Sequence, residues 1–288
     1  MISLQVQYTV IMVNLLKFRM SRYLFLLLCL SSITLWFCNR GYKPPNKDEL
    51  LSNKTYNWQK DTTQHFDIYF ESRYIPNEYV DSAKTIFERK YSELLKYLEI
   101  ANYDSRLKLF MIDTRDKMKN IIGMETNGLA NVEDNTVFSI FNDNIKTFGI
   151  HEFCHIITIN EWGKTDQIWL SEGLAVCSDN AWWGFDLHSL ADYLLIKGKL
   201  VPVEELIENF YKRQSSISYP QSGSFVKFIK EKYGLNILKD LWKNGTSVFQ
   251  KSLNKSLSSI EQEWLEEIKK HDNSNIDYLD KISSLTSK

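Results

Sequence analysis

Two histidines and a glutamate stand close together in the segment 151–155, whose sequence HEFCH has the pattern H-E-x-x-H. On a helix, residues four apart share one face, with Cβ atoms about 5–6 Å apart. His151 and His155 can therefore bind one metal ion, at the distances of about 2.0–2.1 Å that zinc–imidazole bonds have. Glu152 lies too far round the helix to be a good ligand, and it is better placed as a general base for a water molecule beside the metal. The pattern predicts a hydrolytic zinc site on a buried helix.

A carboxylate that suits the third ligand position follows in the segment 169–175, with the sequence WLSEGLA. Sixteen residues separate His155 from Glu172. The apolar residues around Glu172 predict a second helix over about 166–180, and the short connection predicts that it packs against the first. We therefore expect Glu172 to face both histidines. The predicted cofactor is Zn²⁺, bound by His151, His155 and Glu172.

Two alternatives to a working zinc site follow from the same residues. The first is an accidental H-E-x-x-H pattern, but five His among 288 residues make such an accident rare. The second is a remnant of a zinc site that no longer binds metal. All four side chains that the site needs are present, which favours the working site.

Together the two segments resemble the gluzincin metallopeptidases, which include thermolysin and the alanyl aminopeptidases. The similarity is closest to the compact group called peptidase MA-like domains, and it covers roughly residues 64–270. The resemblance implies the zincin, or thermolysin-like, catalytic fold, which belongs to the α+β class. It also implies a zinc metallopeptidase that hydrolyses peptide bonds.

An edge strand that binds substrate is the next feature that the resemblance implies. Gly128, Leu129, Ala130 and Asn131 resemble the strand upstream of the zinc helix, which pairs with the substrate backbone in this family. The aminopeptidases have a glutamate in this strand that holds the free amine of the substrate. Here the nearest glutamate is Glu133, two positions late. The departure favours an endopeptidase over an aminopeptidase.

A tyrosine and Glu152 complete the expected mechanism. The segment 219–225, YPQSGSF, resembles the part of the family that carries the catalytic tyrosine. We expect Glu152 to take a proton from the attacking water and pass it to the leaving amine. Tyr219 would then stabilise the oxyanion together with zinc. Tyr211 is its nearest competitor by sequence, and simple packing is the alternative for either tyrosine.

Several residues near the predicted site allow more than one interpretation. Cys154 and Cys177 are best explained as two small buried thiols, and a disulfide between them is the alternative. Asp179 either holds a histidine from behind or is a solvated residue at a helix end. Trp182 and Trp183 either line a substrate cleft or pack in the core.

The elements around the site are predicted from hydrophobic periodicity, with a small mixed sheet and helices followed by a mostly helical part. The predicted strands cover 65–70, 107–112, 129–131 and 136–141. The predicted helices before the site cover 76–100 and 114–122. The helices after it cover 166–180, 187–197, 203–213, 220–232, 235–244, 246–254 and 258–271. We expect the cleft at the junction of the two parts.

The chain divides into four predicted regions. Residues 1–40 are a signal or anchor segment, 41–63 a polar linker, 64–271 the catalytic domain, and 272–288 a loose polar tail. The formal net charge of −1 gives no reason to expect a nucleic acid partner.

The first region indicates export from the cytoplasm. Basic residues precede the largely apolar run 23–37, which has signal-peptide length and is short for a membrane span. Cys38 follows this run and resembles a lipoprotein attachment site, although Phe37 is larger than the residue expected before such a cysteine. A cleaved secreted protein and an uncleaved N-terminal anchor are the alternatives. The architecture is equally consistent with a start at Met1 or at Met20.

The leading prediction is therefore an exported, membrane-associated zinc endopeptidase that acts on a peptide or protein substrate. An exopeptidase or another zinc hydrolase with the same core is the first alternative. A catalytically silent binding module is the second, and Glu152 argues against it, because binding alone needs no general base.

Overall fold

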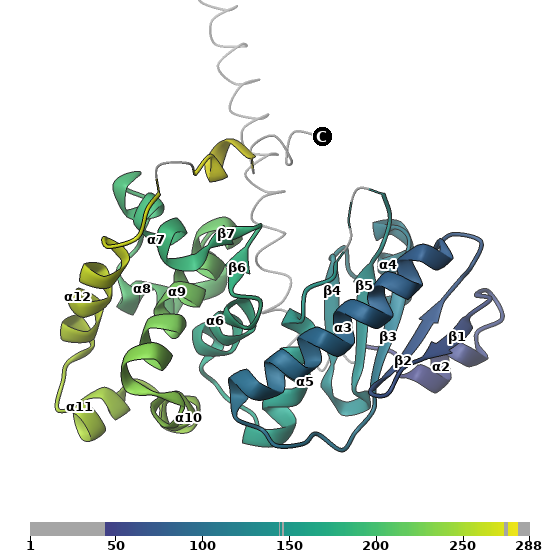
Figure 1. Ribbon diagram of the computed structural model, residues 1–288, viewed down its shortest axis with the longest axis horizontal. Coiled ribbons are helices and arrows are strands. Elements are labelled where there is room, and N and C mark those ends of the chain that lie inside the picture. Colours follow the sequence, from purple (N-terminus) through teal and green to yellow (C-terminus); the bar gives the residue numbers. More distant parts are fainter. Residues whose placement is uncertain (1–43, 144, 146, 274–275, 282–288) are drawn as a thin grey trace, which may run out of the picture.

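The computed structural model describes residues 44–143, 145, 147–273 and 276–281 (Figure 1). A sheet with helices forms the N-terminal part, and a group of helices forms the C-terminal part. The predicted order, a small mixed sheet followed by a mostly helical part, is confirmed. The two helices that carry the predicted metal ligands, α5 (His151–Trp162) and α6 (Ile168–Ser178), follow one another where the two parts meet.

The central sheet has five strands in the order β1-β2-β3-β5-β4. Strands β2, β3 and β5 are parallel, whereas β1 and β4 pair antiparallel at the two edges. The strands are β1 (Gln59–Thr62), β2 (Phe66–Phe70), β3 (Leu107–Ile112), β4 (Gly128–Asn131) and β5 (Thr136–Ile140). Because β4 is the last strand in this order, one side of its backbone has no strand partner among the described residues.

Alternating side chains give the sheet two buried faces. Phe66 and Ile68 belong to the larger core, which α3 and α5 cover. Tyr69 and Phe110 point the other way into a second core, which α2 and α4 cover. This alternation follows from the two-residue period of a strand. The remaining helices of this part are α2 (Lys47–Ser52), α3 (Asn77–Leu98) and α4 (Arg115–Ile122).

The C-terminal part is built around α9 (Ser215–Tyr233), against which α6 packs most extensively. Two glycines permit this close approach. A Cβ on Gly173 would lie 2.6 Å from Ser222 Oγ and 2.8 Å from the Ser222 carbonyl oxygen, and a Cβ on Gly223 would lie 2.5 Å from a methyl group of Val176. The other elements are β6 (Ala181–Trp182), β7 (Phe185–Asp186), α7 (Leu187–Ile196), α8 (Val203–Asn209), the 3₁₀ helix η2 (Phe210–Lys212), α10 (Leu235–Asn244), α11 (Ser247–Leu253) and α12 (Leu257–Ile268).

Residues 44–63, the described part of the predicted linker over 41–63, are structured. Asn46 caps α2 in a capping box with Glu49, and Leu50 is buried in the second core. The strand β1 pairs with β2 along the edge of the sheet. Its side chains are mostly exposed and polar, so the alternation that predicts a strand is absent from its sequence.

The predicted tail over 272–288 also contains a structural residue, because Tyr278 is fully buried. The helix α9 begins at Ser215, earlier than the predicted residue 220, and contains Pro220. Proline has no N–H, so it leaves the carbonyl of Ser216 without its helical partner. The hydroxyl of Tyr278 donates to this carbonyl at 2.7 Å.

The predicted signal or anchor region, including Cys38, lies outside the described residues. Within the described part of the chain, no helix combines the length and the apolar character needed to cross a membrane.

Candidate metal centre

The start of α5 is fixed by Asp179, which directly follows α6. Its two carboxylate oxygens accept the backbone N–H of Ile150 at 3.2 and 3.1 Å, and it pairs with Lys90. A carboxylate here is favourable because the N–H groups at a helix start lack intrahelical partners and carry partial positive charge. The sequence suggested that Asp179 either holds a histidine or is a solvated residue at a helix end. Both interpretations are wrong, because its carboxylate binds the Ile150 N–H and Lys90. Asp179 ties the end of one ligand-bearing helix to the start of the other.

The three predicted ligands converge, as the sequence predicted. His151 Nε2 and His155 Nε2 are 3.2 Å apart. Glu172 Oε2 lies 3.2 Å from His151 Nε2 and 3.4 Å from His155 Nε2. A tetrahedral zinc ion with bonds of about 2.0–2.1 Å separates its ligand atoms by about 3.3–3.4 Å. The three atoms thus have the spacing of three corners of a zinc tetrahedron, and they form a group that can hold a metal.

Glu172 and the neighbouring histidines interact electrostatically. Burial lowers the pKa of His151, but the hydrogen bond with Glu172 and the nearby carboxylates outweigh it, so this pKa is raised. Burial raises the pKa of Glu172, but the charge of His155 and the hydrogen bonds with both histidines hold it well below its ordinary value. Glu172 therefore stays ionised between the two imidazoles, which favours a cation at this position.

Two further side chains orient the ligands from behind. Tyr211 donates its hydroxyl to Glu172 Oε1 at 2.6 Å, which leaves Oε2 directed at the histidines. Ser171 Oγ lies 3.2 Å from His155 Nδ1. An imidazole that offers Nε2 to a metal carries its proton on Nδ1, so His155 would donate this proton to Ser171. Neither contact was predicted, although Ser171 belongs to the segment 169–175 and Tyr211 was considered as the competitor of Tyr219.

Glu152 lies beside the edge strand. A Cβ on Gly128 would come within 2.8 Å of Glu152 Oε1, so glycine at this position leaves room for the carboxylate. The geometry brings the predicted general base next to the first residue of β4.

Tyr219 belongs to the same site. Its ring centroid lies 6.2 Å from that of His151. The ring of Tyr219 also stacks with Trp182, with centroids 5.4 Å apart and an interplanar angle of 21°. Burial, followed by the charges of Glu172 and Glu152, raises the pKa of Tyr219 well above its ordinary value. The hydroxyl therefore keeps its proton, and it has no hydrogen-bond partner among the described residues, so it can donate to a substrate.

Trp182 is itself held in place by the C-terminal segment. Its Nε1–H donates to the hydroxyl of Tyr278 at 2.8 Å. Trp182 is partly buried and packs against the core as well as against Tyr219, whereas Trp183 is 49% exposed. Tyr278 thus supports Tyr219 through the ring of Trp182. The sequence does not reveal this role, because Tyr278 is a single aromatic residue in a polar segment.

The predicted edge strand is β4, and it offers its backbone more than its side chains. Leu129 packs against the second core and Ala130 against the larger core. Asn131 is buried, and its amide contacts the carbonyl oxygens of Pro44 and Pro45 at 3.4 and 3.3 Å. The side chain of Asn131 is thus engaged by the N-terminal segment.

The two cysteines next to the site are free thiols, as predicted, and not a disulfide. Burial raises the pKa of Cys177 to about 11, and the hydroxyl of Tyr97 donates to its sulfur at 3.0 Å. Burial also raises the pKa of Cys154.

A scan against models of protein families finds none that matches this chain, and a search of curated proteins finds no significant match. We therefore infer function from the geometry of the site.

Proposed function

We propose that this protein is a zinc-dependent endopeptidase with a gluzincin-type site on a zincin-like fold. The observation that carries the proposal is the spacing of 3.2, 3.2 and 3.4 Å among His151 Nε2, His155 Nε2 and Glu172 Oε2. Two neutral imidazoles and a carboxylate are the donor set of many catalytic zinc sites, which keep a fourth position open.

When bound, zinc supplies Lewis-acid chemistry, lowering the pKa of an adjacent water to about 7 and stabilising negative charge on oxygen. Glu152 acts as the general base that accepts a proton from the attacking water and later delivers it to the leaving amine. The protonated hydroxyl of Tyr219 donates to the carbonyl oxygen as charge develops on it. Tyr211 and Ser171 keep Glu172 and His155 in the binding orientation.

Peptide is the favoured substrate because β4 is an edge strand and its first residue, Gly128, lies next to Glu152. An extended peptide that adds to this edge places a backbone carbonyl near the general base. No carboxylate stands in 128–131 to hold a free amine, which supports cleavage inside a chain rather than at its end.

Export and membrane attachment through the segment 17–38 belong to the proposal as well. A mass measurement of the membrane-extracted protein tests this part. A lipid-modified N-terminus at Cys38 would support the lipoprotein form, whereas an intact Met1 or Met20 would exclude it.

The test of function combines zinc analysis with cleavage of a mixed peptide library. We expect one zinc per chain, cleavage that a chelator abolishes, and restoration by added zinc. Glu152→Gln should bind the same amount of zinc and cleave nothing. The matched control is Glu204→Gln, an exposed carboxylate in α8 that should leave both properties as they are. Stoichiometric zinc without cleavage would favour a binding module, and cleavage confined to chain ends would favour an exopeptidase.

A further inference from the structure

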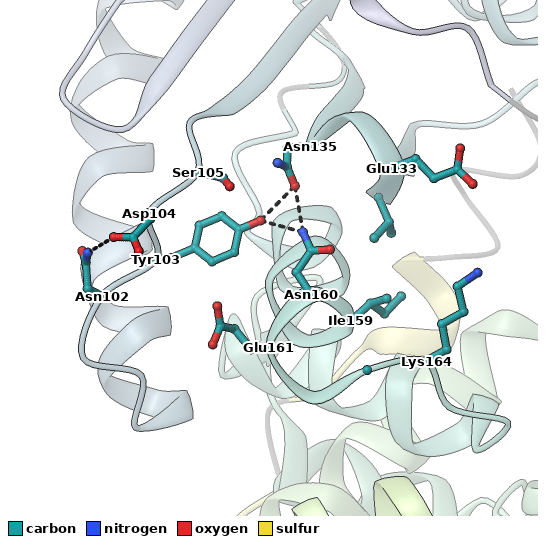
Figure 2. Close-up of a pocket in the computed structure, with 12 residues that line it drawn as sticks. Asn102, Tyr103, Asp104, Ser105, Glu133, Asn135, Ile159, Asn160, Glu161 and Lys164 are labelled. Atoms are coloured by element: carbon teal, nitrogen blue, oxygen red, sulfur yellow. Dashed lines mark hydrogen bonds between the residues drawn. The ribbon is translucent and has the colours of Figure 1, made fainter.

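A hollow with a volume of about 690 Å³ lies at the C-terminal end of α5 (Figure 2). The loop 102–105, the 3₁₀ turn η1 (Val132–Asp134) with Asn135, and the segment 159–164 line it. Its volume falls in the range of about 300–1,000 Å³ that is typical of ligand pockets.

The hollow lies at the far end of β4 and α5 from the predicted metal centre. The edge strand β4 and α5 pack against each other, with Gly128 beside Glu152 at one end. At the other end Val132, the residue after β4, and Ile159 both line the hollow. Ile159 lies one turn beyond His155 on the same helix face.

The distance along this path corresponds to a few substrate residues. Seven helical steps from Glu152 to Ile159 span about 10 Å, and four strand steps from Gly128 to Val132 span about 13 Å. An extended peptide on β4 therefore reaches the hollow about three or four residues from its scissile bond.

The floor of the hollow is a fixed network of polar side chains. Buried Tyr103 donates its hydroxyl to Asn135 Oδ1 at 2.8 Å and accepts from Asn160 Nδ2 at 2.7 Å. Asn160 Nδ2 also donates to Asn135 Oδ1 at 2.8 Å (Figure 2). Both amide hydrogens of Asn160 are used in this way, and its Oδ1 has no hydrogen-bond partner among the described residues. The network thus leaves an acceptor for a ligand.

The walls add negative charge. Three acidic residues, Asp104, Glu133 and Glu161, and one basic residue, Lys164, are among the residues that line the hollow. The Asp104 carboxylate accepts from Asn102 Nδ2, so Glu133 and Glu161 are the two acidic residues on which the argument rests. A guanidinium group has five donors in a planar fork and no acceptor, so it matches carboxylate and amide oxygens.

We propose that this hollow is a subsite for a basic side chain, above all arginine, three or four residues from the scissile bond of the peptide substrate. The inference rests on the proposed peptidase function. It adds a substrate class to that function, namely peptides with a basic residue at one fixed distance from the cleaved bond.

The test is a scan of fluorogenic peptides around one cleavage site. Arginine is moved through four positions on each side, and each peptide has a partner with citrulline, which keeps the shape of arginine without its charge. Exposed ion pairs contribute about 0.2–1 kcal/mol each, so we expect kcat/KM to favour arginine about three- to tenfold at one or two neighbouring positions. The preference should weaken at high salt.

Variants of the lining make the test specific. The double substitution Glu133→Gln and Glu161→Gln should bring the arginine-to-citrulline ratio close to one, whereas Lys164→Gln should raise it. Glu204→Gln, which removes an equal charge outside the hollow, should not change it. Equal ratios at all positions, or a ratio that the double substitution does not alter, would overturn the subsite while leaving the peptidase proposal intact.

A binding measurement separates this inference from the proposed function. Binding of the arginine and citrulline peptides is measured by fluorescence anisotropy. The Glu152→Gln protein is used because it is expected to bind the peptides without cleaving them. Tighter binding of the arginine peptide that disappears when Glu133 and Glu161 are replaced supports the subsite. If the unchanged protein cleaves no peptide but shows this selective binding, the peptidase proposal is contradicted and the subsite for a basic side chain is not.

Discussion

The two ends of α5 differ in how firmly their polar groups are held. At the N-terminal end, the ligands His151, His155 and Glu172 have side chains only 23, 14 and 12% exposed, and Tyr211 and Ser171 hold two of them from behind. At the C-terminal end, Glu133 and Glu161 are exposed on the walls of an open hollow. In the proposed peptidase, the first end would position the reacting atoms, whereas the second would only bias which peptide is bound. Substitutions at the first end should therefore change rate or metal affinity strongly, and those at the second should change selectivity modestly.

After Glu152→Gln, which should abolish cleavage, the largest effect is expected for Tyr219→Phe. Loss of one donor to a developing oxyanion costs about 2.7–4 kcal/mol, so kcat should fall about 100- to 1,000-fold. Zinc content should stay unchanged, because Tyr219 is not a ligand. Tyr74→Phe, on an exposed ring far along the chain, serves as the control. Unchanged kcat in the Tyr219 variant would remove the hydroxyl from the mechanism.

Gly173→Ala tests the packing that places Glu172. The added methyl group would meet Ser222 Oγ at 2.6 Å and the Ser222 carbonyl oxygen at 2.8 Å. Overpacking of this kind lowers the free energy of unfolding by about 1–3 kcal/mol, measurable by urea denaturation. Gly198→Ala is the control, since nothing lies within 4 Å of its Cβ position and only the φ of +62° is strained. We expect zinc affinity to fall in the Gly173 variant and to persist in the control; equal zinc affinity in both would show that this contact does not position the ligand.

Tyr211→Phe separates ligand orientation from catalysis. It removes the hydrogen bond to Glu172 Oε1, and loss of such a supporting contact typically weakens metal affinity about 10- to 100-fold. Competition with a chromophoric chelator measures this change. At saturating zinc, kcat should recover most of its value, in contrast to Tyr219→Phe. If kcat stays low with zinc bound, Tyr211 rather than Tyr219 is the oxyanion donor.

The smallest effect on catalysis is expected for Tyr278→Phe, which removes the donor to the Ser216 carbonyl and the acceptor for Trp182. The change should lower the free energy of unfolding by about 1–3 kcal/mol, because buried partners lose their hydrogen bonds. It should also lower kcat slightly by loosening Trp182 beneath Tyr219. Thermal unfolding and kcat are measured together, and a variant with unchanged values of both would exclude this support.

The sequence predicted those parts of the molecule whose determinants are local. The histidine pair is visible because a helix sets its spacing, and Glu172 is visible because it stands in a strongly apolar helix. The parallel strands carry apolar runs, whereas β1 carries polar side chains at an edge and gives no such signal.

The rest of the site depends on contacts between distant segments. Tyr211 and Ser171 are ordinary residues until the fold places them against Glu172 and His155. Tyr278 is a single aromatic residue in a polar stretch, without periodicity. The hollow combines three segments that are each polar and unremarkable in sequence, so only their arrangement in space indicates a subsite.

Zinc binding by His151, His155 and Glu172 can be tested with a crystal structure of the zinc-loaded protein and anomalous data at the zinc edge. We expect one strong peak about 2.0–2.2 Å from His151 Nε2, His155 Nε2 and a Glu172 carboxylate oxygen. A peak at other residues, or none at saturating zinc, would contradict it.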